Sequence, residues 1–233
     1  MSRRVHPLFV NVMPEKTARI AWVPIILQAF FVVLGVVLAF AANEWREAGV
    51  RQQLADTAVA TISDELVVNR AALYGSAAYH NAVMDTLIFF AAEARRLGDD
   101  AERPNMRHFS QGFSQPSVLP FTAWEAANAT GAVGAMPFEH VLEFSRIYNS
   151  QERYDQQSLR VGELIFEMLF YEGDQGMLDN FENYLGILSA FLYRECELLE
   201  EYDRTLSGLA VVTPSVERPE ACANIGQRRE AAR

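Results

Sequence analysis

Histidine and cysteine, which often hold zinc or carry redox chemistry, are scarce in this chain of 233 residues, with four and two copies. The Cys-x-x-Cys, His-Glu-x-x-His and Glu-x-x-His patterns are absent. Glu139, His140 and Glu143 share the first turn of a predicted helix, where acidic residues usually complement the helix dipole rather than bind a cation. We therefore expect no metal site and no cofactor.

Motifs for phosphate binding and hydrolysis are missing as well. The chain has no glycine-rich phosphate loop and no Gly-x-Ser-x-Gly elbow. We therefore expect no catalytic residues and no enzyme. The sequence also lacks internal repeats and the period-two alternation that is typical of strands, which favours an all-α protein.

Basic residues are few beyond the N-terminal segment. Lys16 is the only lysine, and residues 43–233 hold 29 acidic and 16 basic residues, a net charge of −13. Such a surface repels nucleic acid and anionic headgroups, so we expect no nucleic-acid partner. The acidic excess is typical of a soluble, self-repelling surface.

The longest uncharged run extends from Ile20 to Ala42. Its 23 residues are enough for a helix to cross about 30 Å of hydrocarbon. Trp22 and Trp45 stand near its two ends, where their rings favour the membrane interface. The sequence therefore predicts a transmembrane helix at residues 20–42, with Trp22 and Trp45 as interface anchors.

A cleaved signal peptide is the alternative interpretation, because Ala39-Phe40-Ala41 has the small-x-small form of a cleavage site. The apolar region of a signal peptide is about 7–15 residues long, and this run is longer. The helical pattern also continues without a break into residues 43–47. These two features favour an uncleaved anchor.

Basic residues set the predicted orientation. Two of them, Arg46 and Arg51, lie in the twenty residues after the run, and four precede it: Arg3, Arg4, Lys16 and Arg19. Because excess Lys and Arg stays cytoplasmic, residues 1–19 are predicted to be a cytoplasmic tail. The chain is then a single-pass protein of a bacterial inner membrane whose C-terminal domain lies in the periplasm.

Within the span, Gln28, Gly35, Ala39 and Ala42 recur at steps of 7, 4 and 3 and share one helical face. Small side chains let helix backbones approach closely in lipid, and an amide can hydrogen-bond across the contact. We expect this face to bind an integral membrane protein or a second copy of the chain. A lone anchor with Gln28 near the headgroups is the alternative.

After the span, apolar residues recur at steps of 3 and 4, as in helices packed into a bundle. We expect an extracytoplasmic bundle of about five helices at residues 43–209 and a flexible tail at residues 210–233. The expected helices are 43–74 (ended by Gly75), 76–97, 122–130, 138–171 and 178–208, with an extended, packed segment at 106–120.

Four local features lead to further expectations. Thr122 and Glu125 are predicted to form a capping box. The polar turn Gln151–Ser158 is expected to be solvated, because burying it without partners is costly. Glu195 interrupts the apolar stripe of the last helix, and we place it at the wet rim rather than in a pair with an arginine. Whether Cys196 and Cys222 form a disulfide is left open.

The segment from Gly35 to Ala42, the following Asn43-Glu44-Trp45-Arg46-Glu47 and the amphipathic stretch Ile62–Arg70 resemble a family of uncharacterised bacterial single-span inner-membrane proteins. In that family a Gly-containing span runs into an Asn-x-Trp-x-Glu exit and then a helical extracytoplasmic domain. The resemblance covers residues 25–75. It implies topology and fold class and supplies no catalytic residues.

Two functions fit these features. The first is a non-catalytic interaction or scaffold protein, an accessory subunit of an inner-membrane complex, which binds its partner through Gln28, Gly35, Ala39 and Ala42. The second is an extracytoplasmic sensory or small-ligand-binding module, since bundles can hold small molecules between helices. Because only about nineteen residues lie on the cytoplasmic side, with no room for an output domain, we favour the first.

Overall fold

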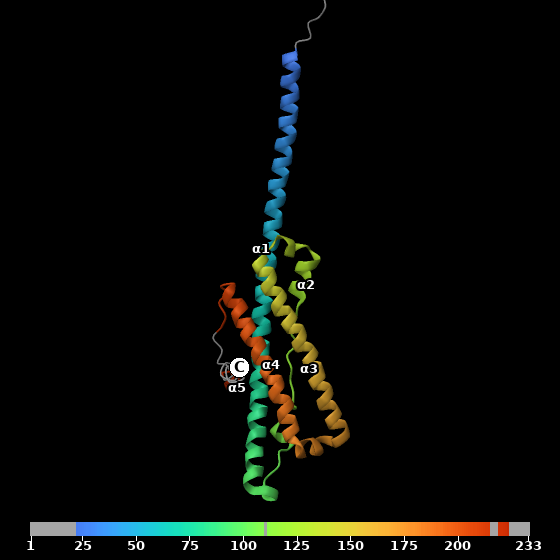
Figure 1. Ribbon diagram of the computed structural model, residues 1–233, viewed down its shortest axis with the longest axis vertical. Coiled ribbons are helices and arrows are strands. Elements are labelled where there is room, and N and C mark those ends of the chain that lie inside the picture. Colours follow the sequence, from blue (N-terminus) through green and yellow to red (C-terminus); the bar gives the residue numbers. More distant parts are fainter. Residues whose placement is uncertain (1–21, 110, 215–218, 224–233) are drawn as a thin grey trace, which may run out of the picture. The chain divides into compact units, whose positions relative to one another are not determined.

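The computed structural model describes residues 22–109, 111–214 and 219–223, and in these ranges it is helical with no strand. The all-α fold class is therefore confirmed. The elements are α1 (Trp22–Leu97), η1 (Gly98–Asp100), η2 (Met106–His108), α2 (Thr122–Ala129), η3 (Ala132–Ala135), α3 (Phe138–Asp179), α4 (Phe181–Gly208) and α5 (Glu220–Ala223) (Figure 1). The described residues divide into two units, with the boundary between Gly49 and Val50.

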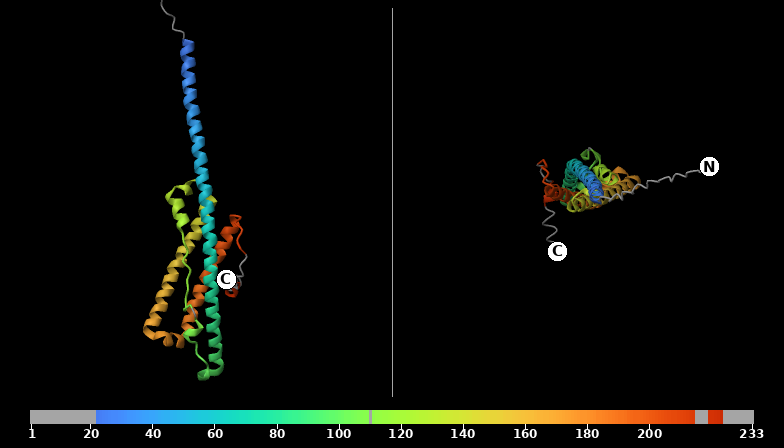
Figure 2. Two further views of the ribbon diagram at one scale, coloured as in Figure 1. Left: turned by 180° about the vertical axis from the view of Figure 1, so that it is seen from behind. Right: turned by 90° about the horizontal axis from the view of Figure 1, so that it is seen from above.

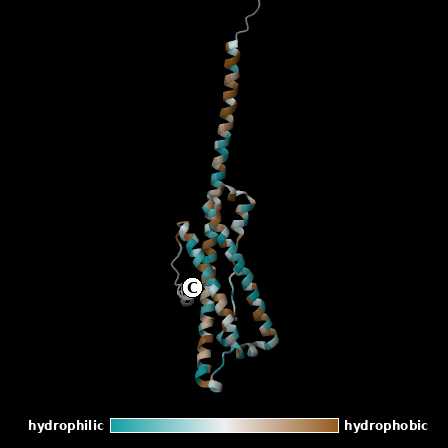
Figure 3. Ribbon diagram, in the orientation of Figure 1, coloured by the Kyte–Doolittle hydropathy of each residue, from teal (hydrophilic) through white to brown (hydrophobic). Residues whose placement is uncertain are grey.

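The first unit is helical from Trp22 onward, and its described residues are all exposed. Figure 3 shows the apolar character of this part of α1. One stretch of the helix is long and apolar enough to cross a membrane. A helix thus occupies residues 22–42 of the predicted span, whereas residues 20 and 21 and the expected tail at 1–19 lie outside the described residues.

The second unit encloses one hydrophobic core between α1, α3 and α4. Ile62, Leu66 and Leu87 of α1 are fully buried, as the 3–4 periodicity predicts. They belong to the same core cluster as Phe144 of α3 and Phe191 of α4. α3 and α4 run side by side in opposite directions (Figure 1).

The expected helix break at Gly75 does not occur, because α1 continues without interruption to Leu97. The two helices expected at 43–74 and 76–97 are therefore one helix in the described ranges. A mid-helix glycine costs only about 1 kcal/mol relative to alanine. Buried residues on both sides of Gly75, among them Leu73 and Ala77, keep the helix packed on the core, and this packing outweighs the cost.

Of the segment expected to be extended and packed, 106–120, residues 106–108 form η2 instead, and the described residues after η2 are extended and packed as expected. Phe109, Phe113 and Leu119 are buried, and the segment passes between α1 and α3 (Figure 2). Helix α2 then ends where Gly131 adopts a left-handed conformation, with φ 76°. This is the position at which the sequence places the helix end.

The last two long helices differ from expectation in their bounds. α3 extends beyond the expected end at Tyr171 to Asp179, with a kink at Gly173, whose φ is 68°. α4 then begins at Phe181. Glycine tolerates this positive φ at no steric cost, so the chain bends there and resumes a helical path.

The expectation of a flexible tail from residue 210 does not hold for α5. Cys222 lies within this short helix, is buried, and forms a disulfide with Cys196 of α4. The question that the sequence left open is thus settled in favour of a bridge. Residues 215–218 and 224–233 of the expected tail lie outside the described residues.

Candidate functional site

The predicted membrane interface lies on one face of α1. Gln28, Gly35, Ala39 and Ala42 are all exposed, and a Cβ atom built on Gly35 would meet no atom within 4 Å. Every residue from Trp22 to Leu54 is likewise exposed. This length of helix therefore offers its whole surface to lipid or to another chain.

Trp22 and Trp45 are also exposed, and so are Asn43, Arg46 and Glu47, the polar residues beside Trp45. Trp22 is 67% exposed and Trp45 is 83% exposed. Next to Trp45, the Asn43 side chain donates to Glu47 at 2.6 Å and accepts from Arg46 at 3.2 Å. The Asn-Glu-Trp-Arg-Glu segment thus satisfies some of its polar groups within one turn of helix.

A second set of polar residues lies inside the bundle, around the extended residues 111–120. Because this segment forms no helix or strand, its buried backbone groups need partners from elsewhere. Helix side chains supply them. The contacts run from Tyr79 to the Gly112 carbonyl, from Tyr184 to the Phe113 carbonyl, from Ser76 to the Gln115 carbonyl, from the Ser117 amide to the Tyr154 hydroxyl, from Gln151 to the Leu119 carbonyl, and from Asn69 to the Pro120 carbonyl.

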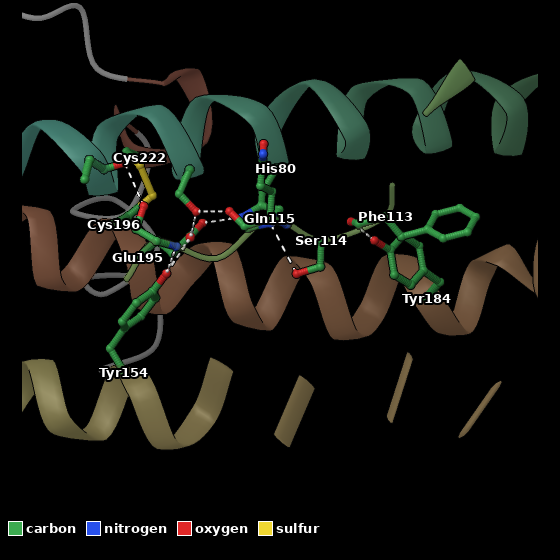
Figure 4. Close-up of polar contacts among 12 residues, drawn as sticks. His80, Phe113, Ser114, Gln115, Tyr154, Tyr184, Glu195, Cys196 and Cys222 are labelled. Atoms are coloured by element: carbon green, nitrogen blue, oxygen red, sulfur yellow. Dashed lines mark hydrogen bonds and ion pairs between the residues drawn. A yellow bond between two sulfur atoms is a disulfide. The ribbon is translucent and has the colours of Figure 1, made fainter. Parts of the chain in front are cut away.

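His80 and Glu195 form the centre of this set (Figure 4). Both side chains are completely buried, and His80 Nδ1 lies 2.8 Å from Glu195 Oε2. The other imidazole nitrogen, Nε2, accepts from the Gln115 backbone amide at 2.8 Å. Since Nε2 is an acceptor, the ring proton is assigned to Nδ1, which donates to the Glu195 carboxyl group.

The second oxygen of Glu195, Oε1, accepts hydrogen bonds from two hydroxyl groups. Ser76 Oγ lies 2.8 Å from Oε1, and Tyr154 Oη lies 3.3 Å from it. Ser76 is also 2.7 Å from the Gln115 carbonyl, so its single proton is shared between two acceptors. The cluster therefore joins α1, α3 and α4 to the extended segment by hydrogen bonds.

The structure overturns two expectations here. Glu195 is not at the wet rim, because its exposure is 0% and its partner is a histidine. The turn Gln151–Ser158 is not wholly solvated either, since Gln151 is 1% exposed and accepts from Tyr202 at 2.7 Å. In both cases an extended chain in the core requires polar side chains, and these satisfy the groups that burial would otherwise leave unpaired.

A third correction concerns the start of α2. Thr122 does not form the expected capping box, because its hydroxyl donates to Glu65 of α1 at 2.7 Å. The same carboxylate oxygen accepts the Ala123 amide at 3.0 Å, and the other accepts the Tyr148 hydroxyl at 2.6 Å. A carboxylate from a neighbouring helix thus replaces the local cap.

Burial sets the titration of the tyrosines in this core. It raises the pKa of Tyr154, Tyr184 and Tyr202 well above the usual value, with the Glu195 charge adding to the effect at Tyr154. The pKa of Tyr148 is raised by burial and by its hydrogen bond to Glu65. These phenols remain protonated donors throughout the physiological range.

The hydrogen bonds of the buried cluster hold the extended segment in place against the helices. Every polar atom of His80 and Glu195 contacts an atom of the chain itself, in pairs that sequence analysis missed because the partners are 115 residues apart. Among the described residues, no group of three or more His, Cys, Asp and Glu side chains is arranged to hold a metal ion. Glu139, His140 and Glu143 are among these described residues.

An open groove lies between α3 and α4, next to Tyr154 of the buried cluster. Its volume is about 460 Å³, and charged side chains dominate its lining, which includes Arg153 of α3 and Arg194, Glu197, Glu201 and Arg204 of α4. Arg194 pairs with Glu197 at 2.7 Å. The groove therefore presents both signs of charge to solvent.

Comparison of this chain with protein-family models, with curated proteins and with solved structures finds no match. The features of the chain that bear on function are the exposed apolar length of α1 and the surfaces of the second unit.

Proposed function

We propose that the protein is a membrane-anchored, non-catalytic interaction subunit. It crosses a bacterial inner membrane once, with its N-terminus in the cytoplasm and residues 43–233 in the periplasm. The Gln28, Gly35, Ala39 and Ala42 face binds a helix of an integral membrane protein or of a second copy. The second unit is the extracytoplasmic part that the anchor holds at the membrane.

The observation that carries this proposal is the exposed run from Trp22 to Ala42. All of its side chains are exposed, and none is charged. In water such a surface is unfavourable, at about 25 cal/mol per Å² of apolar area. In lipid it is favourable, and an uninterrupted helix satisfies its own backbone hydrogen bonds there.

Two independent features support the orientation. Four basic residues precede the span and two follow it within twenty residues. The disulfide between Cys196 and Cys222 is a bond that persists in oxidising compartments and is rare in the cytosol. Both features favour a periplasmic location for the second unit.

Affinity purification of the tagged full-length chain in mild detergent, with quantitative mass spectrometry, tests the proposal. We expect a stoichiometric membrane partner or a homodimer. The Gly35→Ile and Ala39→Ile double variant should lower the recovery of the partner, or of the second copy, about tenfold, because bulky side chains force the helix backbones apart. Val33→Ile with Val37→Ile, on the opposite face, is the matched control and should leave recovery unchanged.

Two outcomes would contradict the proposal. One is equal recovery of the same partners by both double variants. The other is a mature chain in the soluble periplasmic fraction that begins near Ala42, which would identify the run as a signal peptide.

A second candidate function, a small-ligand-binding module, is supported by the groove between α3 and α4. Its volume of about 460 Å³ lies within the usual range for ligand sites. The same purification separates the two functions. A chain that is recovered without a protein partner but with a small molecule in native mass spectra, released by Arg153→Ala, favours the second.

A further inference from the structure

The outer face of α3 carries an apolar stripe that no described residue covers. Leu159, Phe166 and Phe170 are separated by 7 and 4 residues and lie on one helical face, with Tyr171 beside them. Their exposures are 70%, 67%, 72% and 81%. We call these four residues the aromatic stripe.

The opposite face of the same turns is already packed on the core, where Val161 and Ile165 are buried. This part of α3 is therefore apolar on two faces, whereas a surface helix usually has one apolar face. The stripe is also internally ordered. The Phe166 and Phe170 rings stack with centroids 6.2 Å apart, and Tyr171 meets Phe170 edge-on at 5.3 Å.

The area of the stripe is in the range of functional patches. Three aromatic side chains of about 150–250 Å² each, exposed to this degree, together with Leu159, present roughly 500 Å² of apolar surface along this part of α3. The largest apolar patch on a typical monomer is about 300–600 Å² and often mediates binding. Aromatic residues are also the side chains that dominate binding energy at protein interfaces.

Charge decides what fits the stripe. Glu163 and Glu167 are exposed on the same turns, and neither forms an ion pair with another described residue. Arg160 is the single basic residue among the turns from Leu159 to Tyr171. A second copy would bring carboxylates against carboxylates, and anionic lipid would be repelled.

We propose that the aromatic stripe docks an amphipathic, basic segment of a partner protein. The partner's aliphatic or aromatic residues pack on Phe166 and Phe170, and its Lys or Arg side chains pair with Glu163 and Glu167. This surface lies outside the α1 face that is proposed to act in the membrane. The proposal therefore does not depend on the identity of the membrane partner.

Site-specific photo-cross-linking tests this in cells that express the full-length chain with p-benzoylphenylalanine in place of Phe170. We expect an adduct with a different protein, and sequencing of the cross-linked peptide should reveal apolar residues interspersed with Lys or Arg. Glu163→Gln with Glu167→Gln should lower the yield about fivefold, as for two exposed charge pairs. Glu102→Gln with Glu125→Gln, which removes the same charge elsewhere, should leave it unchanged.

The photoreactive residue at Phe138, which is 68% exposed at the start of the same helix, serves as the positional control. An adduct with a second copy, with lipid or with an acidic peptide would overturn the proposal, as would no adduct or a yield insensitive to Glu163 and Glu167. Gly35→Ile with Ala39→Ile should not change the adduct, so failure here and failure of the membrane interface are distinguishable.

Discussion

Buried polar residues are the least predictable positions in this chain. The spacing of apolar residues in the last helix predicts correctly that Leu188, Leu192 and Leu199 face the core. The same stripe contains Glu195, and composition alone favours an exposed carboxylate. What reverses the preference is His80, which is 115 residues away and which no local pattern links to Glu195. Prediction of burial from the sequence thus fails for polar residues whose hydrogen-bond partners come from distant segments of the chain.

The burial of Glu195 leads to a stability prediction. Glu195→Ala removes the acceptor of His80, Ser76 and Tyr154 and should lower the free energy of unfolding by about 3–5 kcal/mol. Glu195→Gln keeps the shape and one acceptor oxygen and should cost about 1–3 kcal/mol. Urea unfolding of the detergent-solubilised chain, followed by helical circular dichroism, measures both changes.

An exposed carboxylate on a neighbouring helix provides the control. Glu163→Ala should change the free energy of unfolding by less than about 0.5 kcal/mol. If Glu195→Ala had an equally small effect, Glu195 would lie at the wet rim after all.

At the scale of elements, the sequence predicts which segments are helical better than it predicts where they end. Glycine marks a real end at Gly131 and a kink at Gly173, where φ is positive, but not at Gly75. The three look alike in sequence. Only tertiary packing on both sides of Gly75 distinguishes it, and that packing follows from the whole fold.

Alanine substitution separates these glycines. Gly75→Ala should stabilise the chain by about 1 kcal/mol, because Gly75 is helical and a Cβ there meets no atom within 4 Å. Gly131→Ala should destabilise it by about 1–2 kcal/mol, because alanine is strained at a φ of 76°. Thermal unfolding of the two variants should shift the midpoint in opposite directions. A loss of stability for Gly75→Ala would favour the broken helix that the sequence predicts.

At the scale of the whole molecule, the C-terminal segment is tied back onto the bundle at two places. Arg70 of α1 bonds Asp203 of α4 at 2.5 Å and reaches the Pro214 carbonyl at 3.4 Å. The disulfide then joins Cys196 to Cys222 across a separation of 26 residues. Loop closure of this length stabilises a fold by about 3 kcal/mol in the chain-entropy description. The bridge therefore makes the stability of the second unit depend on its compartment.

That dependence gives a test of topology through the chain's two thiols. Intact cells are quenched in acid, denatured and treated with maleimide-polyethylene glycol, with and without prior reduction. If residues 43–233 face the periplasm, the native chain should gain no adduct without reductant and two adducts with it, because both sulfur atoms are in the disulfide. Cys222→Ser leaves Cys196 as a lone thiol and should gain one adduct without reductant once the chain is denatured. Two adducts on the unreduced native chain would show that both cysteines are free thiols in the cell. This result would place the second unit in a reducing compartment and reverse the proposed orientation.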